Sequence, residues 1–261
     1  MHHQIDIELV KEIIVEAAEI FANKESVAKI ITKGRADFVT AVDIQVQQFM
    51  QERLTAEYPQ IQFMSEELDN SAVNPEDYVW VLDPVDGTTN LIHDYKRSAV
   101  SLALMKGGES YLGFIYNPYS KEMFHAMKGQ GSFLNDEPIH VSEEEDMANS
   151  LITVGTAPYY KELAKENFAI MERLYAECVD IRRTGSAALD LVDVACGRIE
   201  GYFEKCLKIW DYAAGMLIVR EAGGEVCYFD GRMAAGEPIA DVVAGNKVIL
   251  EKLLKEYLEC L

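Results

Sequence analysis

The residues with the clearest chemical potential are two aspartates, Asp83 and Asp86, which follow directly on the apolar stretch at residues 80–82. Pro84 fixes its own φ angle, so the chain is expected to turn sharply at the strand end and to point both carboxylates into one space. Residues 87–90 read Gly-Thr-Thr-Asn and predict a turn or helix start whose free N–H groups suit a phosphate. The segment predicts metal ions and a phosphate held together, with an acidic surface turn carrying an Asx cap as the plainer alternative.

Acidic residues elsewhere extend this set. Glu66 and Glu67 follow the apolar stretch 61–64, and Asp211 stands at a predicted helix start. Taken alone, the glutamates would be solvated loop acids and Asp211 a helix N-cap. No His or Cys lies at metal-ligand spacing with these acids, and an all-oxygen set selects Mg²⁺ or Mn²⁺ over Zn²⁺. Two such ions about 3.5–4 Å apart can hold both the attacking and the leaving oxygen of a phosphoryl transfer.

The spacing of the aspartates separates two phosphatase chemistries. Haloacid-dehalogenase-type phosphatases also carry an Asp-Gly-Thr sequence, but one residue separates their two aspartates. Here Pro84 and Val85 intervene between Asp83 and Asp86. The sequence therefore argues against an aspartyl-phosphate intermediate and favours direct in-line attack by metal-activated water.

The elements that position these acids begin with helices and continue with strands. Apolar residues at helical spacing predict helices at residues 5–23 and 43–58, the second capped by Asp43, with a polar loop at 33–37. Short apolar runs between turn residues then predict one antiparallel sheet. Its expected strands are residues 61–64, 78–82, 99–105, 111–116 and 123–127.

The second half of the chain alternates between strands and helices, which predicts a layered α/β region. The expected strands are residues 151–154, 179–182 and 202–203 with others near 226 and 242, and the expected helices are residues 159–176, 186–196, 211–222 and from 247 onward. The acidic run at 143–146 predicts a boundary. We therefore expect a mixed α/β chain with an N-terminal α+β subdomain (1–145), a C-terminal α/β subdomain (146–261) and the active site between them.

Four separated motifs resemble those of the inositol monophosphatase family, in the family's order. They are residues 37–43 (DFVTAVD), 66–67 (EE), 83–90 (DPVDGTTN), and 210–215 (WDYAAG) with 221–224 (EAGG). The resemblance covers nearly the whole chain. It implies a layered α-β-α-β-α fold, membership of a metal-dependent, lithium-sensitive phosphatase superfamily, and often a homodimer.

The resemblance also implies metal-binding roles for particular residues. Glu66, Asp83 and the carbonyl of Val85 would bind one Mg²⁺, and Asp83, Asp86 and Asp211 a second. Glu66 with water molecules would hold a third, weaker ion. The implied cofactor is thus two or three Mg²⁺ ions, with Mn²⁺ as a substitute.

The implied substrate is a small phosphorylated polyol, inositol 1-phosphate first. The N–H groups of Gly87 and Thr88 would hold its phosphate, and Thr88 paired with Asp43 would position or deprotonate the attacking water. Three residues would lie at the polyol end: Gly185, Ala187 and Glu204. If residues 202–203 end a strand, Glu204 can face the cavity and accept a hydroxyl; the alternative is a surface glutamate paired with Lys205 or Lys208.

Departures from the family pattern leave other substrates open. Residues 91–96 read LIHDYK, without the usual aromatic and proline, Ser65 replaces a glycine, and Asn135-Asp136 replaces a common Asn-Gly hairpin. NADP, fructose 1,6-bisphosphate and 3′-phosphonucleotides are the alternative substrates. A non-catalytic interaction module with a decayed site is the alternative from another class, although every implied metal ligand is present.

Charge and composition exclude several other classes. The chain has 44 Asp and Glu against 24 Lys and Arg, a net charge of −20, which repels nucleic acid and anionic membranes. No apolar run approaches the ~20 residues of a membrane span, and the N-terminus lacks the regions of a signal peptide. The five cysteines form no C-x-x-C pair. We expect a cytoplasmic protein with reduced thiols.

Overall fold

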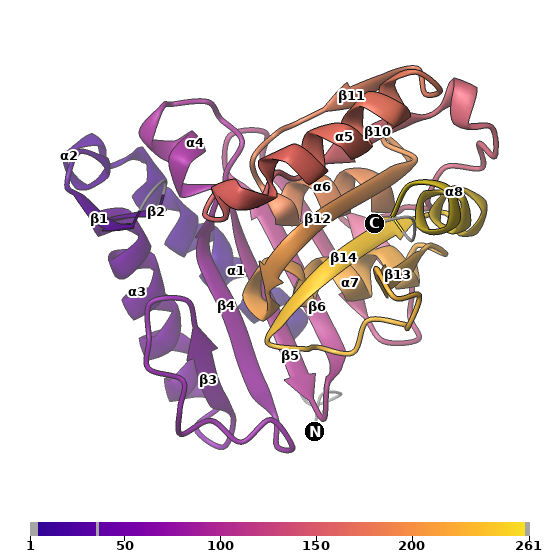
Figure 1. Ribbon diagram of the computed structural model, residues 1–261. Helices are drawn as coiled ribbons and strands as arrows, with labels where there is room; N and C mark the ends of the chain where they lie inside the picture. Colours follow the sequence, from indigo (N-terminus) through magenta and orange to yellow (C-terminus); the bar gives the residue numbers. More distant parts are fainter. Residues whose placement is uncertain (1–4, 35–36, 259–261) are drawn as a thin grey trace.

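The computed structural model of the protein describes residues 5–34 and 37–258, and its elements stack in five layers (Figure 1). Helices α1 (Ile7–Ala18) and α3 (Ala41–Glu57) cover one face of a seven-stranded sheet. Helices α6 (Ala187–Ala195) and α7 (Ile209–Glu221) lie between that sheet and a five-stranded sheet. Helices α5 (Ala164–Tyr175) and α8 (Lys247–Lys252) cover the outer face of the second sheet. The predicted mixed α/β fold with α-β-α-β-α layering is confirmed.

The seven-stranded sheet has the strand order β3-β4-β5-β6-β7-β8-β9. Its strands are β3 (Gln62–Ser65), β4 (Val79–Asp86), β5 (Ala99–Lys106), β6 (Glu109–Asn117), β7 (Glu122–Met127), β8 (Ser132–Leu134) and β9 (Glu137–Pro138). The prediction of a wholly antiparallel sheet was wrong, because β3 pairs parallel to β4. The long connection at residues 66–78 returns the chain to the same end of the sheet, and that path cannot be read from the apolar runs.

Strand β4 alternates its side chains between two apolar layers. Val79 and Val81 belong to the core that contains α6 and α7, whereas Trp80 and Leu82 belong to the core beneath α1 and α3. Because both faces of the strand are covered, the sequence reads as a continuous apolar run rather than as an alternating one. The C-terminal end of β4, with Asp83 and Asp86, therefore lies in the interior of the protein.

The five-stranded sheet has the order β11-β10-β12-β14-β13. Its strands are β10 (Leu151–Val154), β11 (Asp180–Arg182), β12 (Gly201–Lys208), β13 (Glu225–Tyr228) and β14 (Ile239–Gly245). Strand β10 pairs parallel to β11 and β12, and β14 pairs antiparallel to β12 and β13. The two sheets fall on either side of residues 143–146, but one continuous core joins them through α6 and α7. The division into subdomains at that point stays a prediction.

The N-terminal elements differ from the expected boundaries. The predicted helix 5–23 consists of α1 followed by a 3₁₀ helix (Glu19–Ala22), and α2 (Lys24–Val27) comes after it. Strands β1 (Ile30–Gly34) and β2 (Asp37–Thr40) pair where a loop was expected. Asp43 is not the N-cap of α3: Thr40 is the N-cap, and Asp43 accepts a hydrogen bond from the Thr40 N–H at 2.8 Å. Thr40 and Asp43 thus form a reciprocal capping box.

Several smaller features complete the description. Helix α4 (Thr88–Ile92) follows β4, a 3₁₀ turn (Lys161–Leu163) precedes α5, and α8 continues into a π-helix (Leu253–Leu258). The Asn135-Asp136 pair forms the two-residue turn between β8 and β9, with both φ angles positive. No helix in the described part of the chain is long and apolar enough to cross a membrane. The cysteines within the described ranges are free thiols, and Cys260 lies outside them.

His125 on β7 is a polar residue within the first sheet. Its ring stacks between Phe114 and Phe133, with centroid separations of 6.4 and 5.2 Å. Burial, assisted by the positive charge of Lys11, lowers the pKa of His125 to about 4, although Asp136 opposes the shift. Because the unfolded chain has the ordinary pKa near 6.5, it binds a proton first as the pH falls. The contribution to stability is complete above pH 6.5 and is lost as the pH falls toward 4.

We therefore expect His125→Gln to flatten part of the acid dependence of stability. Between pH 7 and pH 5 the wild-type protein should lose about 2 kcal/mol more unfolding free energy than the variant. Urea denaturation of both proteins at each pH measures this difference, and the other titrating groups cancel because both proteins contain them. Parallel pH profiles for the two proteins would contradict the assignment.

Candidate active site

One cavity of about 560 Å³ collects the predicted site residues at the junction of the two sheets. All of them except Asp43 line it: Glu66, Asp83, Val85, Asp86, Gly87, Thr88, Gly185, Ala187, Glu204 and Asp211. A larger cavity of about 920 Å³ lies between α1, α2 and α4, but its acids, Glu19 and Asp94, share it with three lysines. The smaller cavity is the candidate active site because it holds the clustered carboxylates.

A β-bulge explains how Asp83 and Asp86 come to face the same cavity. Residues three apart on a regular strand point to opposite faces. Here Asp83 pairs with Ser101 and Asp86 with Ala99 on β5, so β4 carries one extra residue between them. The expected sharp turn at Pro84 was wrong, since β4 continues through Pro84 to Asp86. The bulge, rather than a turn, places both carboxylates on the side of the second sheet.

Glu66 joins Asp83 because β3 and β4 run parallel. Ser65 lies opposite Leu82, and the Glu66 N–H donates to the carbonyl of Leu82 at 3.4 Å. Glu66 and Asp83, the residues next after this pair, therefore lie close together on neighbouring strands. The negative charge of Glu66 contributes to the raised pKa of both Asp83 and Asp211.

Asp86 connects the first sheet to the N-terminus of α6. Its carboxylate accepts hydrogen bonds from the Ser186 hydroxyl and from the Ala188 N–H, the latter at 3.0 Å. A carboxylate at this position also interacts favourably with the helix dipole. Burial nevertheless raises the pKa of Asp86 to about 6, because these donors offset only part of the desolvation.

Asp211 lies in the first turn of α7 and is partly buried. It is not the N-cap: it occupies the third helical position and accepts from the Lys208 N–H at 2.6 Å. Burial first, and then the charge of Glu66, raise its pKa well above the ordinary value. The same two causes, in the same order, raise the pKa of Asp83. A nearby cation would stabilise the anionic forms of these aspartates.

The donor set fits a hard divalent cation by its chemistry. All four carboxylates, Glu66, Asp83, Asp86 and Asp211, present oxygen to one cavity, which suits Mg²⁺. Within residues 5–34 and 37–258, however, no three His, Cys, Asp or Glu side chains already stand in metal-binding geometry.

Thr88 forms a pair with the buried Asp43 beside these carboxylates. The Thr88 hydroxyl lies 2.8 Å from Asp43 Oδ1 and 3.1 Å from the Val85 carbonyl, and its single proton serves one of them at a time. Asp43 also accepts from the Thr40 hydroxyl at 2.6 Å. Burial raises the pKa of Asp43, and these hydrogen bonds oppose the shift.

Gly87 makes the turn between β4 and α4. Its φ angle is +88°, a conformation that L side chains adopt at a cost. A Cβ there would lie 2.9 Å from the Arg97 carbonyl and 3.2 Å from that of Gly185. The turn thus packs directly against the segment that leads into α6. Helix α4 begins directly after it, beside the cavity.

Glu204 lines the cavity from β12 and is only 9% exposed. The prediction that residues 202–203 end a strand was wrong, since β12 continues to Lys208. Its carboxylate accepts from the Ala157 N–H at 3.0 Å and from the Tyr202 hydroxyl at 2.9 Å. It fills space left by Gly155, where a Cβ would lie 1.9 Å from Glu204 Cδ. The alternative prediction, a surface glutamate paired with Lys205 or Lys208, was wrong: Glu204 is buried, and Lys205 pairs with Glu166 instead.

Sequence reasoning missed several residues at this site. Ser186 binds Asp86 and Tyr202 binds Glu204, and four cationic side chains line the cavity: Lys33, Lys161, Arg183 and Lys208. Ser186 carried a signal as the N-cap of a predicted helix, but its contact with Asp86 spans residues distant in the chain. The cationic side chains carried no recognisable pattern.

Comparison with known proteins shows which family this arrangement is typical of. The model of the inositol monophosphatase family matches residues 3–261. The chain is 40% identical over 225 residues to the Nus factor SuhB of Escherichia coli (strain K12), which covers 85% of this chain and 83% of that protein.

Solved structures give the same result. The structure is similar to that of the extragenic suppressor protein suhB from Bartonella henselae, with a TM-score of 0.87 and 32% identity over 96% of this chain and 98% of that one. It is also similar to the Thermotoga maritima IMPase, with a TM-score of 0.85 and 29% identity over 94% and 93% of the two chains. The chain therefore belongs to the inositol monophosphatase family.

Proposed function

We propose that this protein is a Mg²⁺-dependent phosphatase that hydrolyses the phosphate monoester of a small polyol, with inositol 1-phosphate as the leading substrate. The observation that carries the proposal is the single cavity that joins four carboxylates to the Thr88–Asp43 pair and the Gly87 turn. Family membership supports phosphatase chemistry. The choice of a polyol substrate is inferred from the polar groups that line the cavity beside the carboxylates.

The carboxylates would hold the cations that a site of this charge requires. Glu66 and Asp83 with the Val85 carbonyl form one set, and Asp83, Asp86 and Asp211 form the other, with Asp83 common to both. Bound Mg²⁺ would neutralise the phosphate and polarise its oxygens. Lys33 and Arg183, which line the same cavity, add positive charge at its rim in a chain of net charge −20.

The remaining groups would position the attacking water and bind the phosphate. Thr88 can donate its proton to Asp43, which leaves its oxygen lone pairs directed to the cavity to accept from the attacking water. The first N–H groups of a helix lack intrahelical acceptors, so those at Gly87 and Thr88 suit the phosphate oxygens. Gly185 and Ala187 would contact the polyol and Glu204 would accept one of its hydroxyls.

The substrate alternatives remain NADP, fructose 1,6-bisphosphate and 3′-phosphonucleotides. Arg183 and Lys161 on the cavity wall suit a second anionic group, which inositol 1-phosphate lacks. A panel of phosphate esters on the purified protein, read as phosphate release, ranks these substrates. A homodimer and a cytoplasmic location remain predictions.

A second candidate function follows from the 40% identical relative, whose name, Nus factor SuhB, refers to transcription. The net charge of −20 disfavours direct contact with nucleic acid, so such a role would act through another protein. It would not require the carboxylates of the cavity. Retained binding of a partner protein by a variant that lacks phosphatase activity would separate the two functions.

Removal of divalent cations should abolish phosphate release. The carboxylates of the cavity are buried and repel one another, and without cations they also repel the substrate. EDTA should therefore stop hydrolysis of inositol 1-phosphate, and added Mg²⁺ should restore it. Full activity in chelator would exclude the two-cation proposal.

Asp83→Asn should lower kcat more than any other ligand substitution, because Asp83 is common to both proposed cation sets. The expected loss is a factor of about 10³ or more. In EDTA the variant should melt at or above the wild-type temperature, since one buried charge has been removed from a repulsive cluster. Glu172→Gln on the exposed face of α5 is the matched control and should change neither quantity. A near-normal kcat would refute the assignment.

Glu204→Gln should raise KM for inositol 1-phosphate about tenfold, because an amide is a weaker acceptor for hydroxyls than a carboxylate. A substrate without polyol hydroxyls, 4-nitrophenyl phosphate, should change little. Tyr202→Phe is the comparison, because it frees the Glu204 carboxylate from its internal donor and leaves the charge intact. Equal changes for the two substrates in Glu204→Gln would remove Glu204 from the substrate site.

A further inference from the structure

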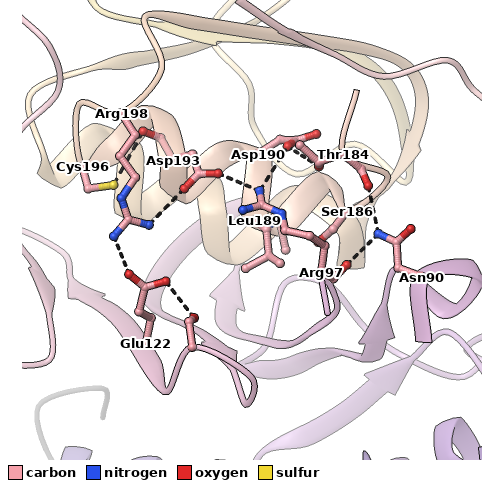
Figure 2. A network of polar contacts seen from close by, with 12 residues as sticks. Asn90, Arg97, Glu122, Thr184, Ser186, Leu189, Asp190, Asp193, Cys196 and Arg198 are labelled. Carbon is pink, nitrogen blue, oxygen red and sulfur yellow. Dashed lines mark hydrogen bonds and ion pairs between the residues drawn. The ribbon is translucent and has the colours of Figure 1, made fainter. Parts of the chain in front are cut away.

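Asn90 lies behind the Gly87 turn and does not line the cavity. It is 7% exposed, and its side-chain nitrogen donates to the carbonyls of Arg97 at 2.7 Å and Thr184 at 2.9 Å. Figure 2 shows this amide between the two segments. An amide NH₂ has two protons, so both are used. Because both partners are carbonyl oxygens, only the nitrogen of the amide can face them.

The two carbonyls lie beside different parts of the proposed substrate site. Arg97 precedes Ser98, whose hydroxyl donates to the Gly87 carbonyl at 2.9 Å, and the Asn90 N–H donates to the same carbonyl at 2.9 Å. Thr184 directly precedes Gly185, where a Cβ would lie 3.2 Å from Asn90 Oδ1. The Asn90 amide therefore contacts the phosphate end on one side and the polyol end on the other.

Charged contacts tie the same two segments to α6. Arg97 donates to Asp193 at 2.7 Å and lies 3.8 Å from Asp190, while the Thr184 hydroxyl donates to Asp190 at 2.5 Å (Figure 2). Asp190 is buried. These contacts hold each segment against the helix. The Asn90 amide links the two segments directly, beside the hydrogen bonds that Ser186 and Ala188 donate to Asp86.

We infer that Asn90 is a positioning residue that fixes the spacing between the phosphate-binding turn and the polyol wall. This inference rests on the proposed function. A substrate that contacts both ends depends on that spacing, whereas a phosphate ester with no polyol hydroxyls depends on the turn alone. Asn90 thereby favours polyol phosphates over other monoesters without touching either.

The test is Asn90→Asp, which keeps the shape of the side chain but removes both donors. We expect kcat/KM for inositol 1-phosphate to fall about tenfold or more, and that for 4-nitrophenyl phosphate to stay within about threefold. His93→Ala, at the exposed end of α4, is the matched control and should leave the ratio unchanged. Thermal unfolding shows whether Asn90→Asp is folded.

If Asn90→Asp does not fold, Thr184→Val removes the hydroxyl that holds the polyol-side segment to Asp190 and should shift the ratio in the same direction by a smaller factor. Equal losses on both substrates, or no loss on either, would overturn the inference. A wild-type protein that leaves inositol 1-phosphate intact would instead contradict the proposed substrate. The same variants are then compared on the best polyol or sugar phosphate of the panel, and the ratio again decides.

Discussion

Repulsion between buried carboxylates is the interaction around which this structure is arranged. Asp83 and Asp86 are almost fully buried and Asp211 is partly buried, and Glu66 adds a further charge to the cavity. Each aspartate receives at least one backbone N–H: Asp83 from Val85, Asp86 from Ala188 and Asp211 from Lys208. These donors come from a bulge and from two helix starts. The backbone geometry of β4, α6 and α7 at the cavity is therefore inseparable from the placement of the charges.

The apolar core provides the rigidity that such a cluster needs. All residues of α6 are buried, and α7 is buried over most of its length between the two sheets. Helices packed on both sides cannot shift their N-termini away from the repelling carboxylates without exposing apolar surface. The energy released by packing thus offsets the electrostatic cost of the site, which is the balance expected where function opposes stability. A bound cation would remove most of that cost.

The proposed site draws its two ends from different halves of the chain. The phosphate end is formed by the Gly87 turn, and the polyol end by residues 185–187 and Glu204. Polar contacts near the site join the halves, among them Asp86 with the start of α6, Arg97 with Asp193 and Asn90 with the Thr184 carbonyl. Under the proposed function, substrate choice would depend on residues that set this spacing as well as on the carboxylates.

The sequence by itself determined which acidic side chains belong to the site region, the glycine turn and the alternation of strands and helices, because local patterns of apolar residues and turn residues suffice for these. It also determined the family, through four motifs in order. The parallel pairing of β3 with β4, the bulge between Asp83 and Asp86, and the contacts Ser186–Asp86 and Tyr202–Glu204 were decided only by the tertiary structure. Sheet pairing and the Ser186–Asp86 contact join segments distant along the chain, and the direction of the Glu204 carboxylate depends on the space left at Gly155. Such contacts depend on how layers pack, and no local pattern of residue types encodes that packing.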